Sequence, residues 1–341
     1  MRNDTRAVYR GYLSQIASLC AIAVDDVSKK FNVTPSAQQS LETKLQQSSK
    51  FLSMINIIGV DEQVGQAIGL TVSGTIAGRT DTSGNGRRQG RDVTGLVKNE
   101  YICKQTDYDT YIPYAKLDAW AKFKDFQKRI SQVIVDRCAL DRIMIGWNGT
   151  SAAATTNRAV NPLLQDVNIG WLKKLRTAAP ARVISEALPG IGKVRIGLTG
   201  DYVDLDALVF VLINNIIDPW HRAALEALGF VVITSRDLNA DRLFPLVQTV
   251  NPPSEMMAAD VIIRAGKAGG LPVVHVPYFP ANSLLITPLS NLSVYWQSGT
   301  RRRRIVDNPA RDRIEDYQSV NEAYVIEDMG KCAFVENIQF V

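Results

Sequence analysis

The chain has 341 residues, of which 46% are hydrophobic and 21% are charged. This composition is typical of a globular protein with a sizeable core and excludes disorder as its main state. Lys and Arg number 39 against 34 Asp and Glu, giving a formal net charge of +5. Because acids and bases are interspersed, we do not expect the concentrated basic face of a dedicated nucleic-acid binder.

Few groups are available for redox, metal or catalytic chemistry. Only two histidines, His221 and His275, are present, and neither has a carboxylate or nucleophile beside it in sequence. The cysteines are scattered and form no CxxC pair, which predicts reduced, mostly buried thiols. They are Cys20, Cys103, Cys138 and Cys332. We therefore expect no cofactor, no metal and no catalysis.

Residues 16–24 (IASLCAIAV) are as apolar as a short signal core. However, Asp4 lies upstream, and Asp25 and Asp26 follow at once. No apolar run approaches the roughly 18 residues that a membrane span needs. We expect a soluble protein that stays in the compartment where it is made and has no membrane partner.

Two helices are predicted at the start of the chain. The first is a short amphipathic helix within 1–31, followed by a basic, polar segment at 28–31. Thr34 and Pro35 then suit the N-cap and first position of a second helix. The apolar stripes are Val8, Tyr12, Ile16 and Leu19 in the first helix, and Leu41, Leu45, Leu52 and Ile55 behind Pro35.

A projecting hairpin is predicted next. Alternating residues indicate a strand at 68–76 and a second extended stretch from about 93 to 114. Between them, 78–90 (GRTDTSGNGRRQG) is rich in glycine and almost devoid of apolar residues. Its GxGxxxG spacing, with no helix following, favours a flexible tip over a nucleotide-binding loop. A projecting hairpin cannot bury its own apolar face and needs a partner.

From 117 to about 147, apolar residues recur every three or four positions without a proline. This periodicity predicts one helix of about 45 Å, longer than most globular domains use. We interpret it as a structural spine, followed by a polar connector at 148–160.

The second half mixes helices and strands, without an internal repeat. Helices are predicted at 205–217, 221–228, 237–244 and 255–264. Strands are predicted at 230–234, 273–276, 284–287, 292–296, 323–327 and 333–341. The stretch 265–271 (AGKAGGL) lacks the Ser or Thr that follows Lys in a phosphate loop, so we expect a turn.

Three acids flank the start of the predicted helix at 205–217. Asp201, Asp204 and Asp206 could suggest a metal site, but acids at this position also favour the helix dipole. Capping is therefore the expected role.

The strongest charge run comprises Arg301, Arg302, Arg303 and Arg304. It could contact phosphates, but several acids follow closely in sequence. A solvated loop, or a salt-bridged contact with a neighbouring subunit, is favoured over a specific DNA site. The acids are Asp307, Asp312, Glu315 and Asp316.

The order of these elements resembles the HK97 capsid fold, which tailed phages share with encapsulins. The sequence itself is similar to the P2-type family of phage major capsid proteins. The stretches that carry the likeness are DVSKKF (26–31), LDAWAKFKDFQKRI (117–130), NPLLQDV (161–167), APARV (179–183), DYVDLDALV (201–209), EMMAADVI (255–262), VPYFPANSLLIT (276–287) and NLSVYW (291–296). They span nearly the whole chain in order.

The resemblance implies an α+β fold with a long spine helix in a peripheral domain and a mixed α/β axial domain. Its expected parts are an amino-terminal scaffold-like segment (1–31), an arm (32–58), an extended hairpin loop (59–114), the peripheral domain (115–180 and 290–341) and the axial domain (181–289). Removal of 1–31 on maturation is expected, with cleavage near Phe31 and Asn32, because a flexible basic segment at 28–30 separates it from the body.

The implied function is that of a non-catalytic shell subunit. Hexamers and pentamers would form an icosahedral phage head, guided by an internal scaffold that also supplies a protease. Double-stranded DNA would enter through a portal and be contacted non-specifically. The expected location is the virion, after assembly in the cytoplasm of the host bacterium.

The hairpin tip is expected to contact a neighbouring subunit. It carries Arg79, Arg87, Arg88 and Arg91 against the single acid Asp81. An acidic surface, such as that expected at 312–316, would be its partner. Because no lysine lies between 65 and 97, we expect no covalent lysine–asparagine link from this loop.

Two other functions remain open at this point. An encapsulin-type shell shares the fold but encloses enzymes, and DNA inside purified particles would discriminate against it. A DNA-binding protein using Arg301–Arg304 would show salt-sensitive duplex binding by dissociated subunits. An enzyme is remote, because no acid/base constellation is evident.

Overall fold

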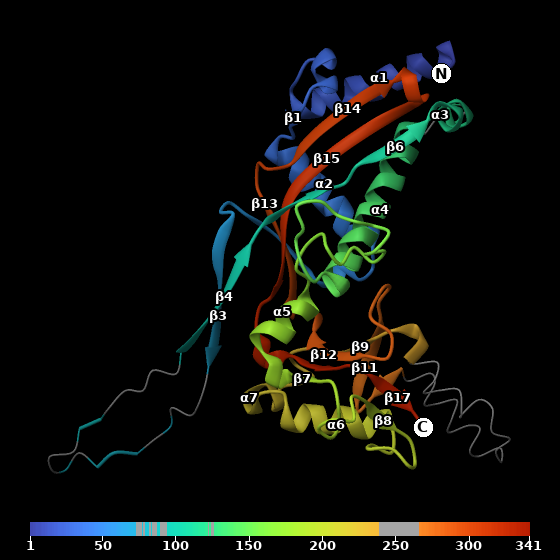
Figure 1. The fold of residues 1–341 in the computed structure, drawn as a ribbon. Coiled ribbons are helices and arrows are strands. Elements are labelled where there is room, and N and C mark those ends of the chain that lie inside the picture. Colours follow the sequence, from blue (N-terminus) through green and yellow to red (C-terminus); the bar gives the residue numbers. More distant parts are fainter. Residues whose placement is uncertain are drawn as a thin grey trace.

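The computed structural model describes residues 1–72, 77, 79–81, 83, 87–88, 94–121, 123, 126–238 and 266–341. In this part of the chain, two sheets lie at opposite ends of an elongated body, and a strand pair extends from its side (Figure 1). The two chain ends lie at opposite ends of the body (Figure 1).

The α-helices are α1 (Asn3–Cys20), α2 (Pro35–Ser48), α3 (Tyr114–Trp120), α4 (Phe126–Asn148), α5 (Trp171–Ala178), α6 (Leu205–Asn215) and α7 (Pro219–Arg222). The 3-10 helices are η1 (Val24–Ser28), η2 (Leu52–Met54), η3 (Pro180–Arg182), η4 (Leu289–Asn291), η5 (Pro309–Arg311) and η6 (Met329–Lys331). The strands of the first half are β1 (Phe31–Asn32), β2 (Asn56–Val60), β3 (Val64–Val72), β4 (Thr94–Ile102), β5 (Lys104–Asp107) and β6 (Thr110–Pro113). Those of the second half are β7 (Val183–Ile184), β8 (Val194–Ile196), β9 (Phe230–Thr234), β10 (Lys267–Ala268), β11 (Leu271–His275), β12 (Leu284–Pro288), β13 (Leu292–Gln297), β14 (Arg302–Asn308), β15 (Arg313–Ile326), β16 (Ala333–Val335) and β17 (Ile338–Phe340).

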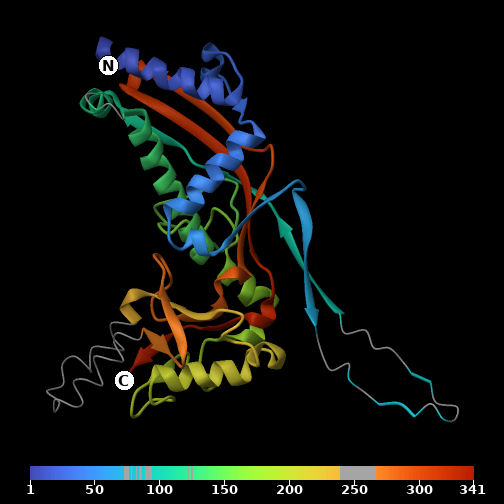
Figure 2. The same ribbon diagram turned by 180° about the vertical axis from the view of Figure 1, so that it is seen from behind.

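A seven-stranded sheet is built around the long strand β15. Its order is β1-β14-β15-β13-β2, and β5 and β6 also pair with β15. Helices α2 and α4 cover one face of this sheet (Figure 2). Their apolar residues join a large core with the inward side chains of the sheet, among them Leu45, Ile143 and Tyr324.

A six-stranded sheet of order β10-β11-β9-β12-β16-β7 forms the other end. Its inner strands β9 and β12 are buried on both faces, which explains why they read as continuous apolar runs. Along β9, Val232 packs into a second core with Leu208 of α6, whereas Ile233 packs into the large core. The six-stranded sheet therefore joins the two cores.

The predicted hairpin is confirmed. Strands β3 and β4 pair antiparallel, from Val64 opposite Ile102 to Val72 opposite Thr94, and they extend away from the body (Figure 2). The predicted strand residues 73–76 and 93, and most of the tip 78–90, lie outside the described residues.

The prediction of one continuous spine helix is wrong. Helix α3 ends at Trp120, and the N–H of Phe123 bonds to the Trp120 carbonyl only three residues back. The Phe123 ring lies 4.4 Å from the Arg129 guanidinium. Helix α4 begins at Phe126, and its 23 residues span about 35 Å. Residues 121–125 contain neither proline nor glycine, and apolar residues continue at helical spacing across them, so sequence alone could not reveal this break.

Other boundaries also differ from the predictions. Residues 94–114 form three strands and the first residue of α3: β4 pairs with β3, whereas β5 and β6 pair with separate parts of β15. Residues 333–341 hold two strands, because β16 pairs with β12 and β17 with β8. Helix α7 ends at Arg222, well before 228. The strand expected at 323–327 is the end of the longer β15. Of the helices expected at 237–244 and 255–264, nearly all residues lie outside the described ranges.

The amino-terminal segment is attached to the body. In α1, Tyr9, Tyr12 and Ile16 are buried, whereas Leu19 is 62% exposed, contrary to the predicted stripe. Strand β1 pairs Phe31 with Arg303 of β14. The segment leading into β1 is therefore tied down at both ends, and the expectation that it is a flexible separator is wrong.

The described part of the chain contains no helix that is both long and apolar enough to cross a membrane.

Candidate functional site

The arginine run is mostly a strand, not a solvated loop. Because side chains alternate along β14, Arg303 points inward, and its guanidinium bonds to Asp316 at 2.7 Å and to the Tyr12 hydroxyl at 2.9 Å. Arg301, just before the strand, is 2% exposed and bonds to Glu42 and Gln318. These two arginines stabilise the interior of the subunit.

The other two arginines of the run, Arg302 and Arg304, are exposed. Arg304 donates to the Ser28 carbonyl at 2.9 Å, which helps to hold the amino-terminal segment against β14. Of the four residues expected to contact a neighbour or DNA, only these two present their side chains to solvent.

A buried ion network lies behind the run, and sequence reasoning missed it. Arg142 of α4 is fully buried between two carboxylates, 2.6 Å from Glu42 of α2 and 2.5 Å from Glu322 of β15. The Tyr108 hydroxyl donates to the other carboxylate oxygen of Glu322, Oε2, at 2.9 Å. Arg301 completes a network of two arginines and two glutamates. An arginine within the apolar stripe of α4 was the one available signal.

The charges in this network are stabilised by one another. Burial would raise the pKa of Glu42, but Arg142 and Arg301 more than offset it, so the pKa lies below its ordinary value. Burial raises the pKa of Tyr108 well above its usual range, and the Glu322 charge adds to the effect. Glu42 therefore stays ionised at neutral pH, and the network joins α2, α4 and the seven-stranded sheet.

The acidic surface expected at 312–316 is largely internal. Asp316 is bonded to Arg303, and Glu315 accepts hydrogen bonds from Arg313, Tyr317 and Asn308. Both carboxylates are buried. In this stretch only Asp312 is an exposed acid. The prediction that 312–316 offers an acidic surface to the hairpin tip is therefore wrong.

Of the tip arginines, Arg79, Arg87 and Arg88 are exposed, and Arg91 lies outside the described residues. Asp81 accepts from the backbone N–H and hydroxyl of Ser83, which lowers the pKa of its carboxyl. The described tip arginines thus have their charges available to another surface.

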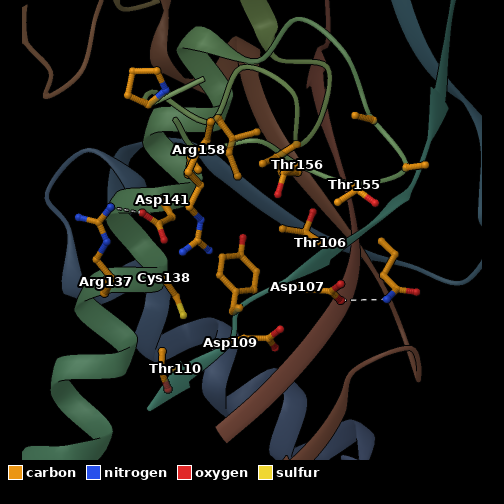
Figure 3. A pocket seen from close by; sticks show the side chains of 18 residues that line it. Thr106, Asp107, Asp109, Thr110, Arg137, Cys138, Asp141, Thr155, Thr156 and Arg158 are labelled. Carbon is orange, nitrogen blue, oxygen red and sulfur yellow. Dashed lines mark hydrogen bonds and ion pairs between the residues drawn. The ribbon is translucent and has the colours of Figure 1, made fainter. Parts of the chain in front are cut away.

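A polar groove of about 770 Å³ opens between β5, β6, α4 and the connector after α4 (Figure 3). Asp107 and Asp109 stand exposed on one wall, and Arg137 bonds to Asp141 at 2.6 Å on another. Burial and the neighbouring Asp107 charge raise the pKa of Asp109. The groove combines the exposed carboxylates of Asp107 and Asp109 with the hydroxyls of Thr155 and Thr156, and Arg158 also lines it.

Of the three acids around α6, only Asp204 has the expected capping role, whereas Asp201 and Asp206 bond elsewhere. Asp204 is the N-cap, and its carboxylate accepts from the Ala207 N–H at 2.6 Å. Asp201 pairs with Arg195 at 3.1 Å, and Asp206 accepts from the Gly269 N–H at 2.5 Å. Within the described ranges, no group of three or more His, Cys, Asp or Glu is arranged to hold a metal ion.

All four cysteines are free and buried, which confirms the prediction. Burial raises the pKa of the Cys138 and Cys332 thiols to about 11. They are therefore inert at neutral pH. His275 lies in β11, as predicted. His221 lies 3.1 Å from Asp328, a partner 107 residues away that its sequence neighbours could not indicate.

Comparisons with known proteins agree over the whole chain. The model of the family described as "Phage major capsid protein, P2 family" matches residues 8–338. A protein of Escherichia phage P2 described as "Capsid proteins" is 48% identical, over 99% of this chain and 96% of that protein. A chain from the procapsid of satellite phage P4, including the size determination (Sid) protein, superposes with a TM-score of 0.80 at 45% identity, covering 100% of this chain and 99% of that one.

A more distant structure shares the fold alone. The capsid asymmetric unit of cyanophage A-1(L) superposes with a TM-score of 0.52 at 14% identity, over 83% of this chain and 90% of that one.

Proposed function

Because the chain belongs to the P2 family of phage major capsid proteins, we propose that it assembles as hexamers and pentamers into an icosahedral head around double-stranded DNA. The chain is a structural, non-enzymatic subunit with the HK97-like capsid fold, it self-assembles into a shell, and its place is the virion. The whole-length likeness to a procapsid subunit carries the proposal.

The proposed division of the subunit follows the sheets. The seven-stranded sheet with α4 forms the peripheral domain (104–180 and 290–332), joined by the arm (32–58), and the six-stranded sheet with α6 forms the axial domain (181–289). Strand pairing supports two changes from the sequence-based boundaries. Because β16 pairs with β12 and β17 with β8, residues 333–341 go with the axial domain. Because β5 and β6 pair with β15, residues 104–114 go with the peripheral domain, and the extended loop is 61–103.

The proposed partners beyond the chain itself are an internal scaffold with its protease, a portal and packaged DNA, with assembly in the host cytoplasm. The net charge of +5 supports weak, non-specific contact with DNA. A DNA-binding role for the whole run Arg301–Arg304 has little support, because two of its four guanidinium groups are bonded inside the subunit. No observation favours an enzyme-filled compartment.

Amino-terminal cleavage remains part of the proposal. The bond between Phe31 and Asn32 lies in β1, paired with β14. A protease needs an extended, accessible strand, so β1 must leave β14 before cleavage. We expect subunits from infectious virions to lack residues 1–31, and intact-mass spectrometry measures this directly. A full-length mass in virions would contradict the proposal.

Assembly itself is the main test. The chain produced together with its scaffold should form closed, roughly spherical particles in electron micrographs, and those from infected cells should contain double-stranded DNA. Sedimentation that shows only monomers or dimers under the same conditions would refute the shell function.

A further inference from the structure

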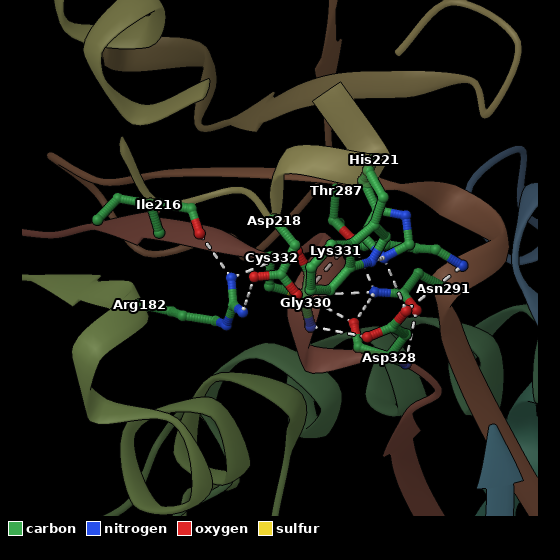
Figure 4. Close-up of polar contacts among 11 residues, drawn as sticks. Arg182, Ile216, Asp218, His221, Thr287, Asn291, Asp328, Gly330, Lys331 and Cys332 are labelled. Atoms are coloured by element: carbon green, nitrogen blue, oxygen red, sulfur yellow. Dashed lines mark hydrogen bonds and ion pairs between the residues drawn. The ribbon is translucent and has the colours of Figure 1, made fainter. Parts of the chain in front are cut away.

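The chain crosses between the two sheets after α5, after β12 and after β15. Each crossing contains a short 3-10 helix, respectively η3, η4 and η6. Polar side chains bring these three crossings together at one place (Figure 4). We call this cluster, made by Arg182, Asp218, His221, Asn291 and Asp328, the waist.

Side chains bond the crossings to one another. The Asn291 amide of η4 donates to the Asp328 carbonyl at 2.8 Å, and the Asp328 N–H donates back to the Asn291 Oδ1 at 2.8 Å. Arg182 of η3 donates to the Gly330 carbonyl of η6 at 3.3 Å and to Asp218 at 2.7 Å. All connections between the two sheets therefore share one hydrogen-bond network.

The packing at the waist leaves no room for adjustment at Gly330. A Cβ atom added there would lie 2.3 Å from the Asp218 Oδ2. Because Asp218 also receives the Arg182 guanidinium, movement of the α6–α7 corner and movement of η6 are coupled sterically as well as through hydrogen bonds.

His221 adds a contact that can change. Its Nε2 lies 3.2 Å from the Trp220 Nε1, an obligate donor, and 3.1 Å from the Asp328 Oδ2, an acceptor. A ring nitrogen either carries a proton and donates or lacks one and accepts. It can therefore satisfy only one of these two partners at a time.

We propose that His221 is a proton-controlled tether at the waist. In this proposal the neutral imidazole is the Nδ1–H tautomer, whose Nε2 accepts from Trp220, a contact within α7. The imidazolium instead donates to Asp328, a contact that ties α7 to the crossing between the two sheets. Acidification thus exchanges a local hydrogen bond for one that spans the waist and fixes the axial sheet relative to the peripheral sheet.

The surrounding charges set the pH of this exchange. Burial lowers the pKa of His221 below 6.5, Asp328 raises it in part, and Lys331 lowers it again. Lys331 itself lies 3.7 Å from Asp328. The other charged groups near His221 are already bonded: Asp218 is paired with Arg182, and Arg222 donates to the Ile217 carbonyl. The neutral form therefore prevails at neutral pH, and the tether to Asp328 forms only in acid.

Histidine hydrogen–deuterium exchange, read by mass spectrometry on the full-length chain in subunits and in particles, measures the His221 pKa. Trp220 is 43% exposed, so Trp220→Phe removes its N–H without emptying the core. We expect Trp220→Phe to raise the His221 pKa by about half a unit to one unit, because the neutral form loses its donor. Asp328→Asn should lower it. His275 in the same chain is the internal control.

Backbone amide exchange gives a second readout. In the wild-type chain, protection in η4 and η6 should increase as pH falls through the His221 transition, after correction for intrinsic exchange. In His221→Gln this change should disappear. An unchanged His221 pKa in Trp220→Phe, or the same amide response in His221→Gln as in wild type, would overturn the proposal. Neither outcome bears on whether the chain forms shells.

Discussion

At the scale of single residues, the interior beside the seven-stranded sheet is held by charge as well as by apolar packing. Arg142 has no exposed surface and is bonded to glutamates from two other elements. Charges buried to this degree are stable only when each is paired, because the cost of desolvation is large. The pairing therefore fixes how α2, α4 and β15 meet.

Glu322→Gln should destabilise the subunit strongly. It leaves two arginines facing one glutamate in a region that water does not reach, and breaking such a buried pair costs about 3–5 kcal/mol. Denaturant unfolding of dissociated subunits measures the change in free energy. The control is Arg137→Ala, which breaks the partly exposed pair with Asp141 and should cost about 0–1 kcal/mol. Similar losses in both variants would contradict the role of the network.

Lys174 makes the free energy of unfolding depend on pH in mild alkali. Burial lowers its pKa from 10.5 to about 8, with a partial opposing effect of Cys103. The unfolded chain therefore binds this proton more tightly, so Lys174 contributes a rise in the free energy of unfolding as pH increases from about 8 towards 10.5. The raised thiol pKa values of Cys138 and Cys332 contribute a fall in the same range. Lys174→Met should therefore be more stable than wild type at neutral pH and lose this advantage as pH rises. Lys173→Met, at the exposed neighbouring position, should leave the slope unchanged when unfolding is followed across the pH series.

At the scale of elements, helix α4 meets α5 at an unusually close crossing. A Cβ atom added to Gly146 would lie 2.2 Å from the Trp171 ring, and one added to Gly170 would lie 2.4 Å from the Gly146 carbonyl oxygen. Trp171 and Trp147 are both buried there, with ring centroids 4.8 Å apart. The absence of side chains allows the two helices to bring these rings together.

Gly146→Ala should therefore destabilise the protein, although alanine is the better helix former by about 1 kcal/mol. Overpacking against a buried ring that cannot move costs about 1–3 kcal/mol and outweighs the gain in helix propensity. Thermal unfolding of the subunit measures the effect. Ser131→Ala, on the exposed face of the same helix, is the control and should be neutral or slightly stabilising. A stabilised Gly146→Ala chain would show that the close crossing is not required.

At the scale of the whole molecule, the β3–β4 hairpin extends away from the body of its own subunit. The exposed arginines at its end have no acidic stretch at 312–316 to meet, because those carboxylates are bonded internally. We propose that the groove wall bearing Asp107 and Asp109 on a neighbouring subunit receives them. Each exposed ion pair is weak, about 0–1 kcal/mol, but a closed shell repeats it in every subunit.

Replacing Arg87, Arg88 and Arg91 by Ser should leave the unfolding of dissociated subunits nearly unchanged and make particles fragile. The difference from wild type should shrink as salt rises and screens the contact. Calorimetry of subunits and of particles at two salt concentrations measures both effects. Replacing the exposed Lys44, Lys50 and Lys116 by Ser removes the same charge elsewhere and should not weaken particles as much.

A charge exchange identifies the acceptor. Asp107→Arg with Asp109→Arg should weaken particles, and adding Arg87→Asp with Arg88→Asp in the same chain should restore them. If particles in which Arg87, Arg88 and Arg91 are replaced by Ser are as robust as wild type at low salt, the tip is not an intersubunit contact. If only the exchange fails to restore stability, the tip binds another surface.

The sequence by itself determined those features that depend on local pattern. Apolar runs located β9 and β12, Thr34 and Pro35 located the start of α2, and Asp204 located the cap of α6. The alternating stretches around the glycine-rich tip were sufficient to predict the β3–β4 hairpin. These signals are readable because each arises from residues within a few positions of one another.

Only the tertiary structure decided which charged side chains are buried and which groups they pair with. Four consecutive arginines look solvated in sequence, yet Arg301 faces Glu42, 259 residues away, and Arg303 faces Asp316 of the next strand, because strand alternation turns every second side chain inward. His221 and Asp328 likewise meet across 107 residues. Whether a charged residue is buried depends on its partner, and a partner distant in sequence leaves no local pattern by which it could have been predicted.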